Sequence, residues 1–149
     1  MQRGLPLLVI GCALLLAPLA HAAGQATPDE AKTMAIKAAE YLKAVGPEKA
    51  FPEFTAKDGP WYDRDLYVIV QNNQGVMLVN GPFPALVGRN VLNLKDPDGE
   101  PFNQDQQAIT DAGWVHFRWM NPATKAIEPK TTYVVRVGDY LLIVGAYAK

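Results

Sequence analysis

The sequence contains no serine, one cysteine and two histidines in 149 residues. Cys12 and His21 both lie within the first 22 residues, so the rest of the chain keeps His116 alone. This composition excludes a Ser-His-Asp triad anywhere, and beyond residue 22 it excludes disulfides, cysteine nucleophiles and cysteine-ligated zinc. A lone histidine does not predict a metal site, so we expect neither a metal nor another cofactor.

A long uninterrupted hydrophobic run is also missing. The apolar stretch Leu5–Leu19 contains two prolines and a glycine, and it is shorter than the roughly 20 residues of a membrane-spanning helix. Because Arg3 precedes it and the small-x-small motif of residues 20–22 follows it, we predict a signal peptide over residues 1–22 and a periplasmic location. A membrane anchor and lipidation at Cys12 are the alternatives, but the apolar run continuing past Cys12 favours a signal core.

The charge is nearly balanced, with a formal net charge of −1 at pH 7. Removal of Arg3 with the leader makes it one unit more negative, which gives no reason to expect nucleic acid as a partner. Residues 23–149 are enough for one hydrophobic core and too few for two ordinary domains. We therefore expect one domain whose partners are small molecules or other proteins.

A helix is predicted to start at Thr27, where Pro28 follows the N-cap and Glu30 completes a capping box. Gly46 and Pro47 end it. Its apolar residues recur at helical spacing and form one stripe: Ala31, Met34, Ala35, Ala38, Tyr41, Leu42 and Val45. This stripe has two interpretations, packing on the core of the domain or a homodimer contact through the N-terminal helix.

The rest of the chain reads as strands with helical insertions. We predict a helical turn at 48–55, a hairpin of strands 65–71 and 76–80, a helix at 101–112, and strands at 114–119, 131–137 and 140–147. The last strand is apolar on both alternating faces, so neither face can be left in water. The order predicts an α+β, PAS-like domain in which a long N-terminal helix packs on a five-stranded antiparallel sheet with a helical crossover.

Two acidic motifs do not predict catalysis or metal binding. Residues 96–100 superficially resemble a calcium loop, but the glycine comes fourth instead of sixth, so we interpret the motif as a turn. Asp63 and Asp65 flank Arg64, which favours ion pairing or solvation over an acid-base pair.

Cationic side chains stand among rings near the C-terminus. Arg118 and Lys130, beside Phe117, Trp119 and Tyr133, predict a pocket for a small organic acid, because arginine and lysine both bind carboxylates. The alternative is that both cations are exposed charges at the edge of a strand.

Many short phrases in order resemble the single Cache domain of type 2 over residues 27–147. They are Asp58–Tyr62, Asp65–Val68, Gly75–Leu78, Leu86–Asn90, Asp96–Gly99, Gly113–Val115, Asn121–Pro122, Glu128–Lys130 and Tyr133–Val134. The resemblance implies a PAS-like fold that senses small molecules, often short organic acids, outside the cytoplasm. Such domains are typically the input part of chemoreceptors and sensor kinases.

The resemblance also implies a ligand pocket between the sheet and the crossover. Its wall would include Tyr67, Met77, Leu86, Phe117, Trp119, Lys130 and Tyr133, with Arg89 and Arg118 as further candidates. Family members often have a histidine where this chain has Asn80, at the end of the second strand. Asparagine forms hydrogen bonds but carries no positive charge, so this departure bears on which ligand is bound.

The sequence as a whole predicts a binding module that captures a short organic acid and acts through a separate membrane-bound receptor or transporter. Lys130 or an arginine would fix the anionic end, and Tyr67 and Tyr133 would donate hydrogen bonds. An interaction or structural protein of the cell envelope, with its pocket filled by its own side chains, is one alternative. An enzyme is another, but no nucleophile stands beside a base in a recognisable spacing.

Overall fold

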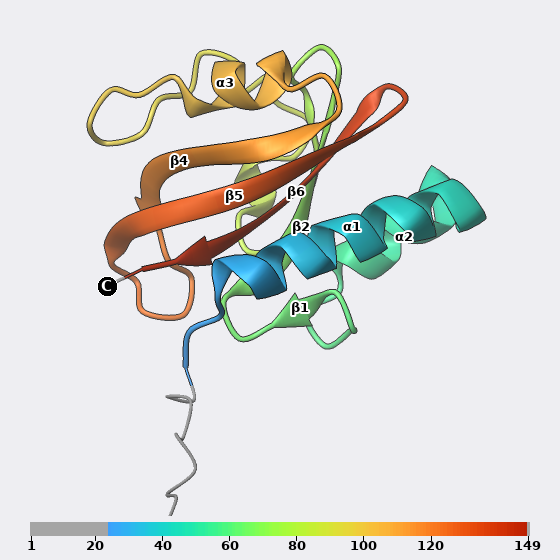
Figure 1. The fold of residues 1–149 in the computed structure, drawn as a ribbon, viewed down its shortest axis with the longest axis horizontal. Helices are drawn as coiled ribbons and strands as arrows, with labels where there is room; N and C mark the ends of the chain where they lie inside the picture. The colour runs from blue at the N-terminus through green and yellow to red at the C-terminus, as the bar shows by residue number, and fades with distance from the viewer. Residues whose placement is uncertain (1–23, 149) are drawn as a thin grey trace, which may run out of the picture.

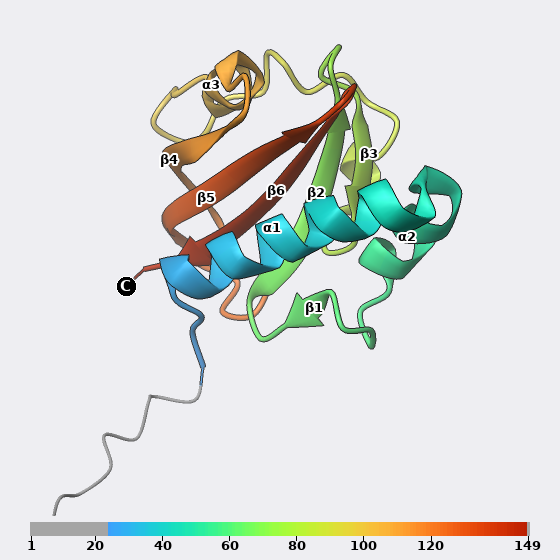
Figure 2. The same ribbon diagram turned by 45° about the vertical axis from the view of Figure 1, so that its right-hand side comes forward.

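The computed structural model describes residues 24–148, so the predicted signal peptide lies outside the described residues. Figures 1 and 2 show one twisted sheet with a long helix along one face and a loop-rich crossover on the other. In chain order the elements are α1 Pro28–Val45, α2 Pro47–Thr55, β1 Tyr62–Asp63, β2 Leu66–Asn72, β3 Met77–Asn80, the 3-10 helix η1 Pro84–Leu86, α3 Phe102–Ala108, β4 Ala112–Met120, β5 Ile127–Val137 and β6 Tyr140–Tyr147. The predicted α+β class is confirmed.

Helix α1 begins as the capping box predicts. The Glu30 backbone N–H donates to Thr27 Oγ1 at 3.2 Å, and the Thr27 N–H donates to Glu30 Oε2 at 2.7 Å. The buried positions of the helix, which pack on the sheet, are Ala31, Ala35, Ala38, Ala39 and Leu42. The core-packing interpretation is therefore right, and the stripe that a helix-mediated homodimer would use is already occupied within the chain.

The sheet is antiparallel throughout. Its order is β1-β2-β6-β5-β4, and β3 pairs with the same strand, β2, as β1 does. Strands β2 to β6 are the five that the sequence predicts, and the two-residue β1 is an addition. The last strand, β6, thus lies between β2 and β5 in the middle of the sheet (Figure 2).

Two element boundaries differ by four residues from the sequence prediction. The helix predicted to reach residue 112 ends at Ala108, because Ala112 already pairs with Val135 in the sheet. Strand β5 begins at Ile127 and includes Pro129. Proline has no N–H group to donate, so it is tolerated only where a strand has no partner to bond with that group. Pro129 lies at such a place, because β6 ends at Tyr147 and the Pro129 carbonyl already accepts from the Ala148 N–H just beyond it.

Both faces of β6 are buried, as its composition predicts. Leu142 and Val144 belong to the core under α1, and Leu141 and Ile143 belong to a second core under the crossover. Each of these four side chains is fully buried. The sheet is therefore the middle layer of three, and the second core contains the candidate site.

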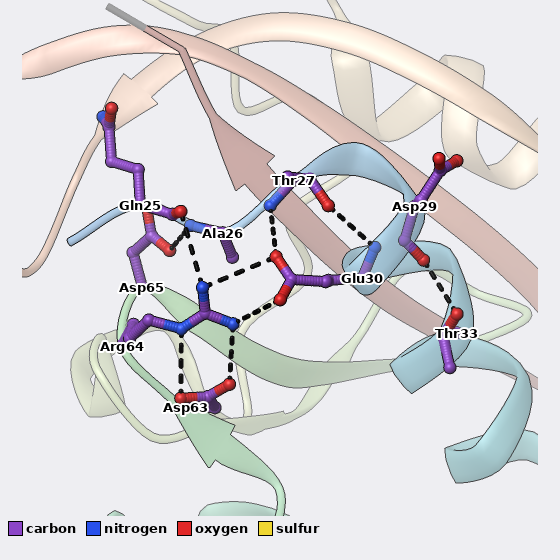
Figure 3. Close-up of polar contacts among 9 residues, drawn as sticks. All are labelled: Gln25, Ala26, Thr27, Asp29, Glu30, Thr33, Asp63, Arg64 and Asp65. Carbon is purple, nitrogen blue, oxygen red and sulfur yellow. Dashed lines mark hydrogen bonds and ion pairs between the residues drawn. The ribbon is translucent and has the colours of Figure 1, made fainter. Parts of the chain in front are cut away.

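An ion-pair cluster joins the start of α1 to the β1–β2 turn, and Figure 3 shows its contacts. Arg64, at φ 57°, places Nη2 2.8 Å from Glu30 Oε1 and 2.9 Å from Asp63 Oδ2. The hydrogen bond from Arg64 is the main cause that lowers the pKa of Glu30 to about 2. The predicted ion pairing is confirmed for Asp63.

Asp65 behaves differently from its neighbour. Its side chain is fully buried, and Oδ1 accepts from the Ala26 N–H at 2.9 Å (Figure 3). Burial raises its pKa, and Oδ2 has no hydrogen-bond partner among residues 24–148. The prediction of a solvated or ion-paired Asp65 is wrong, because the carboxylate is buried in the turn before β2 and bonds the backbone of Ala26.

The acidic motif at 96–100 is a turn, as predicted. Asp96 Oδ1 accepts from the N–H groups of Asp98 and Glu100, each at 2.9 Å, and Oδ2 accepts from the Arg118 N–H at 2.9 Å. Its oxygens therefore organise the backbone of the loop. Within the described residues no group of three or more acidic, histidine or cysteine side chains is placed to hold a metal ion.

Candidate ligand-binding site

A small cavity of about 20 Å³ lies on the face of the sheet opposite α1, beneath the crossover. Strands β2, β3, β4 and β5 line it together with η1, α3 and the loop before α3. Its lining residues are Tyr67, Ile69, Gln71, Met77, Asn80, Leu86, Leu94, Phe102, Asn103, Gln106, Phe117, Trp119 and Lys130. Seven of the ten ligand-binding residues predicted from the sequence are in this set: Tyr67, Met77, Asn80, Leu86, Phe117, Trp119 and Lys130.

Lys130 is the cation of this cavity. Its backbone pairs with Phe117 on β4 and Tyr147 on β6, and the residue is only 2% exposed. Its Nζ donates to Tyr67 Oη at 2.8 Å and lies 4.4 Å and 4.7 Å from the ring centroids of Tyr67 and Tyr147. The two rings stabilise the ammonium group by cation–π contacts, but no carboxylate forms a salt bridge with it among the described residues.

The hydrogen bonds around Lys130 have a fixed direction. Tyr147 Oη donates to the Met120 carbonyl at 2.9 Å, which uses its single hydrogen. Tyr67 Oη, 3.0 Å from Tyr147 Oη, must then be the donor of that pair. The Tyr67 hydrogen therefore points away from any ligand, whereas the ammonium group of Lys130, with one hydrogen bond made to the described residues, has two more N–H groups to offer.

Gly145 makes the reach of Lys130 possible. A Cβ atom at residue 145 would lie 2.5 Å from Lys130 Cε and 2.7 Å from Thr132 Cγ2. The lysine chain therefore crosses β6 through the space that a side chain would fill, and reaches Tyr67 on β2. The sequence does signal this, since a glycine inside an apolar strand often marks a close approach of another group, but our sequence analysis did not identify it.

Burial sets the protonation of Lys130. Loss of water lowers its pKa from 10.5 to about 7, and the nearby Asp65 charge opposes that change. The same desolvation raises the pKa of Tyr67 and of Tyr147, so both phenols stay neutral near pH 7. The cavity thus contains a lysine that exchanges its proton near neutral pH and that an anion would hold in the charged form.

Three predicted residues lie outside the cavity. Arg118 is exposed on the side of β4 that faces away from the cavity, and its Nη1 lies 3.4 Å from Asp98 Oδ1. Arg89 is exposed in the loop after η1, and its carbonyl accepts from the Met77 N–H. Tyr133 lies three residues after Lys130 on β5, so the two side chains point to opposite sides of the sheet and Tyr133 faces α1. Its ring packs on that of Trp114, with the ring centroids 4.7 Å apart.

An amide cluster that the sequence analysis missed forms another wall. Gln71 Nε2 donates to Asn103 Oδ1 at 2.8 Å and to Gln106 Oε1 at 3.3 Å, and all three residues are buried. Gln71 shares the inward face of β2 with Tyr67, and Asn103 and Gln106 are three residues apart on α3, so both spacings were available in the sequence. The remaining unpredicted residues of the lining are Ile69, Leu94 and Phe102.

A comparison with protein families decides which fold this is. The model of the single Cache domain 2 family matches residues 20–149. The chain belongs to the single Cache domain 2 family. Cache domains are extracytoplasmic sensory domains that bind ligands. Within residues 24–148 of this Cache domain, no helix combines the length and the apolar character needed to cross a membrane.

Two curated relatives are signalling proteins. The sensor histidine kinase MctS of Rhizobium johnstonii is 31% identical over 86 residues, which are 56% of this chain and 19% of that protein. The methyl-accepting chemotaxis protein McpP of Pseudomonas putida is 27% identical over 88 residues, 57% of this chain and 16% of that protein. The Cache domain thus matches less than a fifth of the length of either relative.

Solved structures share the fold. A methyl-accepting chemotaxis protein from Vibrio parahaemolyticus superimposes with a TM-score of 0.68 at 22% identity, covering 80% of this chain and 86% of that one. A Cache chemosensory domain described for its carboxylic acid recognition gives 0.68 at 24% identity, covering 81% and 92%. The predicted family and the PAS-like fold are confirmed.

Proposed function

We propose that this Cache domain binds a short organic acid in the periplasm and reports its presence to a separate membrane-bound receptor or transporter. Lys130 carries the proposal, because it is a buried ammonium group with free N–H donors in a cavity and without a carboxylate partner among residues 24–148. A buried charge of this kind is unfavourable unless it is paired, and a ligand carboxylate would pair it. The carboxylic acid recognition described for the structural neighbour supports the same ligand class.

The cavity limits the size of the ligand. Its volume of about 20 Å³ holds one or two water molecules, so an acid of two to four carbons already requires some movement of the wall. Leu86, half-buried on η1, belongs to the thin cover of the cavity. A short acid with outward movement of this cover fits the site better than a long or branched one.

The proposed partner follows from the relatives. Both curated relatives are several times longer than this chain and are named as a kinase and a chemotaxis protein, so each has regions that the Cache match does not include. We propose that a second protein supplies the signalling output. The ion-paired start of α1, which contacts the β1–β2 turn beside buried Asp65, is the part of the described fold that we expect such a partner to sense.

A thermal-shift screen of the purified protein tests the ligand class. Acids of two to six carbons are compared with amines of the same length and with sodium chloride at equal ionic strength. A ligand at about one hundred times its Kd adds about 2.7 kcal/mol, so we expect the melting temperature to rise by several degrees with short acids only. Equal shifts with amines, or no shift in a folded protein, would contradict the proposal and favour the envelope interaction protein.

Binding should weaken as pH rises. The anion binds the protonated lysine, and the pKa of Lys130 in the free protein is about 7. We therefore expect the apparent affinity to be highest near pH 6, where the acid is ionised and the lysine protonated, and roughly 100-fold lower at pH 9, as measured by isothermal titration calorimetry. An affinity that stays constant from pH 6 to pH 9 would show that Lys130 is not the anchor.

The stability of the empty protein should show the opposite trend. Because the pKa of Lys130 is lower in the folded than in the unfolded chain, the unfolded chain binds more protons between about pH 7 and 10.5. This residue therefore makes the free energy of unfolding rise with pH through that window. Chemical denaturation at each pH, with and without ligand, separates the two trends.

A further inference from the structure

Trp119 separates the cavity from a second, larger hollow at the surface. Ten of the thirteen residues that line the cavity are buried, so its wall reaches solvent at few places. The three partly exposed residues are Leu86, Leu94 and Trp119. Of these, Trp119 alone also lines a surface groove of about 360 Å³. Its side chain is therefore a wall that the cavity and the groove share.

The surface groove is mainly apolar and has one free charge. Apolar side chains, among them Phe83, Met120 and Ile127, line it together with Lys95 and Asp96. Both carboxylate oxygens of Asp96 already accept from backbone N–H groups. Lys95 is exposed and forms no salt bridge within residues 24–148. An unpaired cation at the rim of a concave surface attracts small anions.

The ring of Trp119 is packed against other rings on both sides of the wall. Its centroid lies 5.3 Å from that of Phe102, which lines the cavity, and 6.3 Å from that of Phe83, which lines the groove. The backbone of Trp119 pairs with Glu128 in the sheet. A change of side-chain rotamer would therefore break contacts between rings and leave the strand pairing intact.

We infer that short organic acids enter and leave the cavity through the surface groove, and that the side chain of Trp119 is the gate between the two hollows. The inference rests on the proposed function, which places the acid in the cavity. Lys95 attracts the anion to the groove, and Lys130 binds it after the gate opens. A gate slows entry and exit alike, so it determines the exchange rates and leaves the affinity unchanged.

Exchange kinetics test the gate. Line shapes of ¹³C-labelled acetate in NMR spectra at pH 6 give the dissociation rate, and calorimetry gives the Kd. Trp119→Ala joins the two hollows, so we expect association and dissociation both to become about tenfold faster while the Kd changes by less than about threefold. A residue that merely contacts the bound acid would alter dissociation alone. Trp119→Phe has a smaller ring, keeps the aromatic packing and should accelerate both rates severalfold if the alanine variant does not fold.

Leu86→Ala and Leu94→Ala are the matched controls, since both residues are partly exposed in the same lining. Neither should change the association rate. Equal acceleration by either control would place the entrance elsewhere and overturn the inference. Acetate, propanoate and butanoate that all fail to bind the wild type would overturn the proposed function as well, whereas binding with rates that both Trp119 variants leave unchanged would overturn the gate alone.

Thiol labelling tests the gate without any acid. Cys12 is the only cysteine of the sequence, so in a Cys12→Ala background Met77→Cys places a single thiol in the cavity. We expect methyl methanethiosulfonate to modify it about tenfold faster when Trp119→Ala is added. Val144→Cys, fully buried under α1, should react slowly with or without Trp119→Ala. Labelling at position 77 that Trp119→Ala does not accelerate would refute the gate.

Lys95→Met tests the role of the groove. We expect acetate to associate about two- to threefold more slowly at low ionic strength, and the difference to vanish at high salt. Lys43→Met, on the exposed side of α1, removes the same charge away from the groove and should leave the rate unchanged. Equal slowing by both variants would remove the groove as the entrance.

Discussion

Replacing Lys130 with methionine is expected to weaken strongly the stabilisation of this Cache domain by short carboxylates. The variant loses a charge-assisted hydrogen bond in a buried site, worth about 1.5–3 kcal/mol, so affinity should fall about 10- to 100-fold. Methionine has nearly the same length and needs no partner, so the empty protein should be as stable as the wild type or more stable. Ligand titrations followed by melting temperature measure both effects together.

The combination of the two effects distinguishes a binding residue from a structural one. If Lys130 served only the fold, its replacement would lower the melting temperature of the empty protein. Lys43→Met, on the exposed side of α1, is the matched control and should change neither property. A Lys130→Met protein that binds short acids as tightly as the wild type would remove Lys130 as the anion anchor.

Gly145→Ala is expected to have the second large effect, although residue 145 makes no predicted contact with the ligand. The added Cβ would lie 2.5 Å from Lys130 Cε, which is closer than any van der Waals contact allows. The lysine must then leave Tyr67, so we expect carboxylate binding to be lost together with about 1–3 kcal/mol of stability. Calorimetry and chemical denaturation measure the two losses.

A double-variant cycle tests the physical cause. In a Lys130→Ala background, the clash between residue 145 and the lysine chain is gone, and Gly145→Ala should be less destabilising there than in the wild type. Thr132 Cγ2, at 2.7 Å from the same Cβ position, retains part of the penalty. Gly113→Ala is the matched strand control, since its Cβ would lie 3.0 Å from the terminal Cδ1 of Ile109 and away from Lys130, and it should leave binding unchanged.

Much of the fold follows from local chemistry in the sequence. The Thr27 capping box, the Gly46 stop and the two-sided apolar character of residues 140–147 depend on neighbours in the chain or on one strand. The errors at the end of α3 and the start of β5 arose from strand partners far along the chain. Ala112 pairs with Val135, and Ile127 pairs with Met120. Propensity alone does not include such partners.

The cavity was anticipated less well than the fold, and part of the reason is strand alternation. Lys130 and Tyr133 are three residues apart on β5 and therefore cannot face the same side, and the same rule separates Arg118 from Phe117. This information was in the sequence. The amide cluster was also readable, since Asn103 and Gln106 share one side of α3.

By itself, the sequence determined the family, the order of helices and strands and the presence of a two-sided sheet, because each depends on residues close together in the chain. The tertiary structure alone decided which of three candidate cations enters the cavity. Lys130 does so because β6 lies between β2 and β5, and because Gly145 on β6 leaves space for the lysine chain to reach Tyr67. That arrangement joins residues 63 positions apart, and no local pattern encodes it.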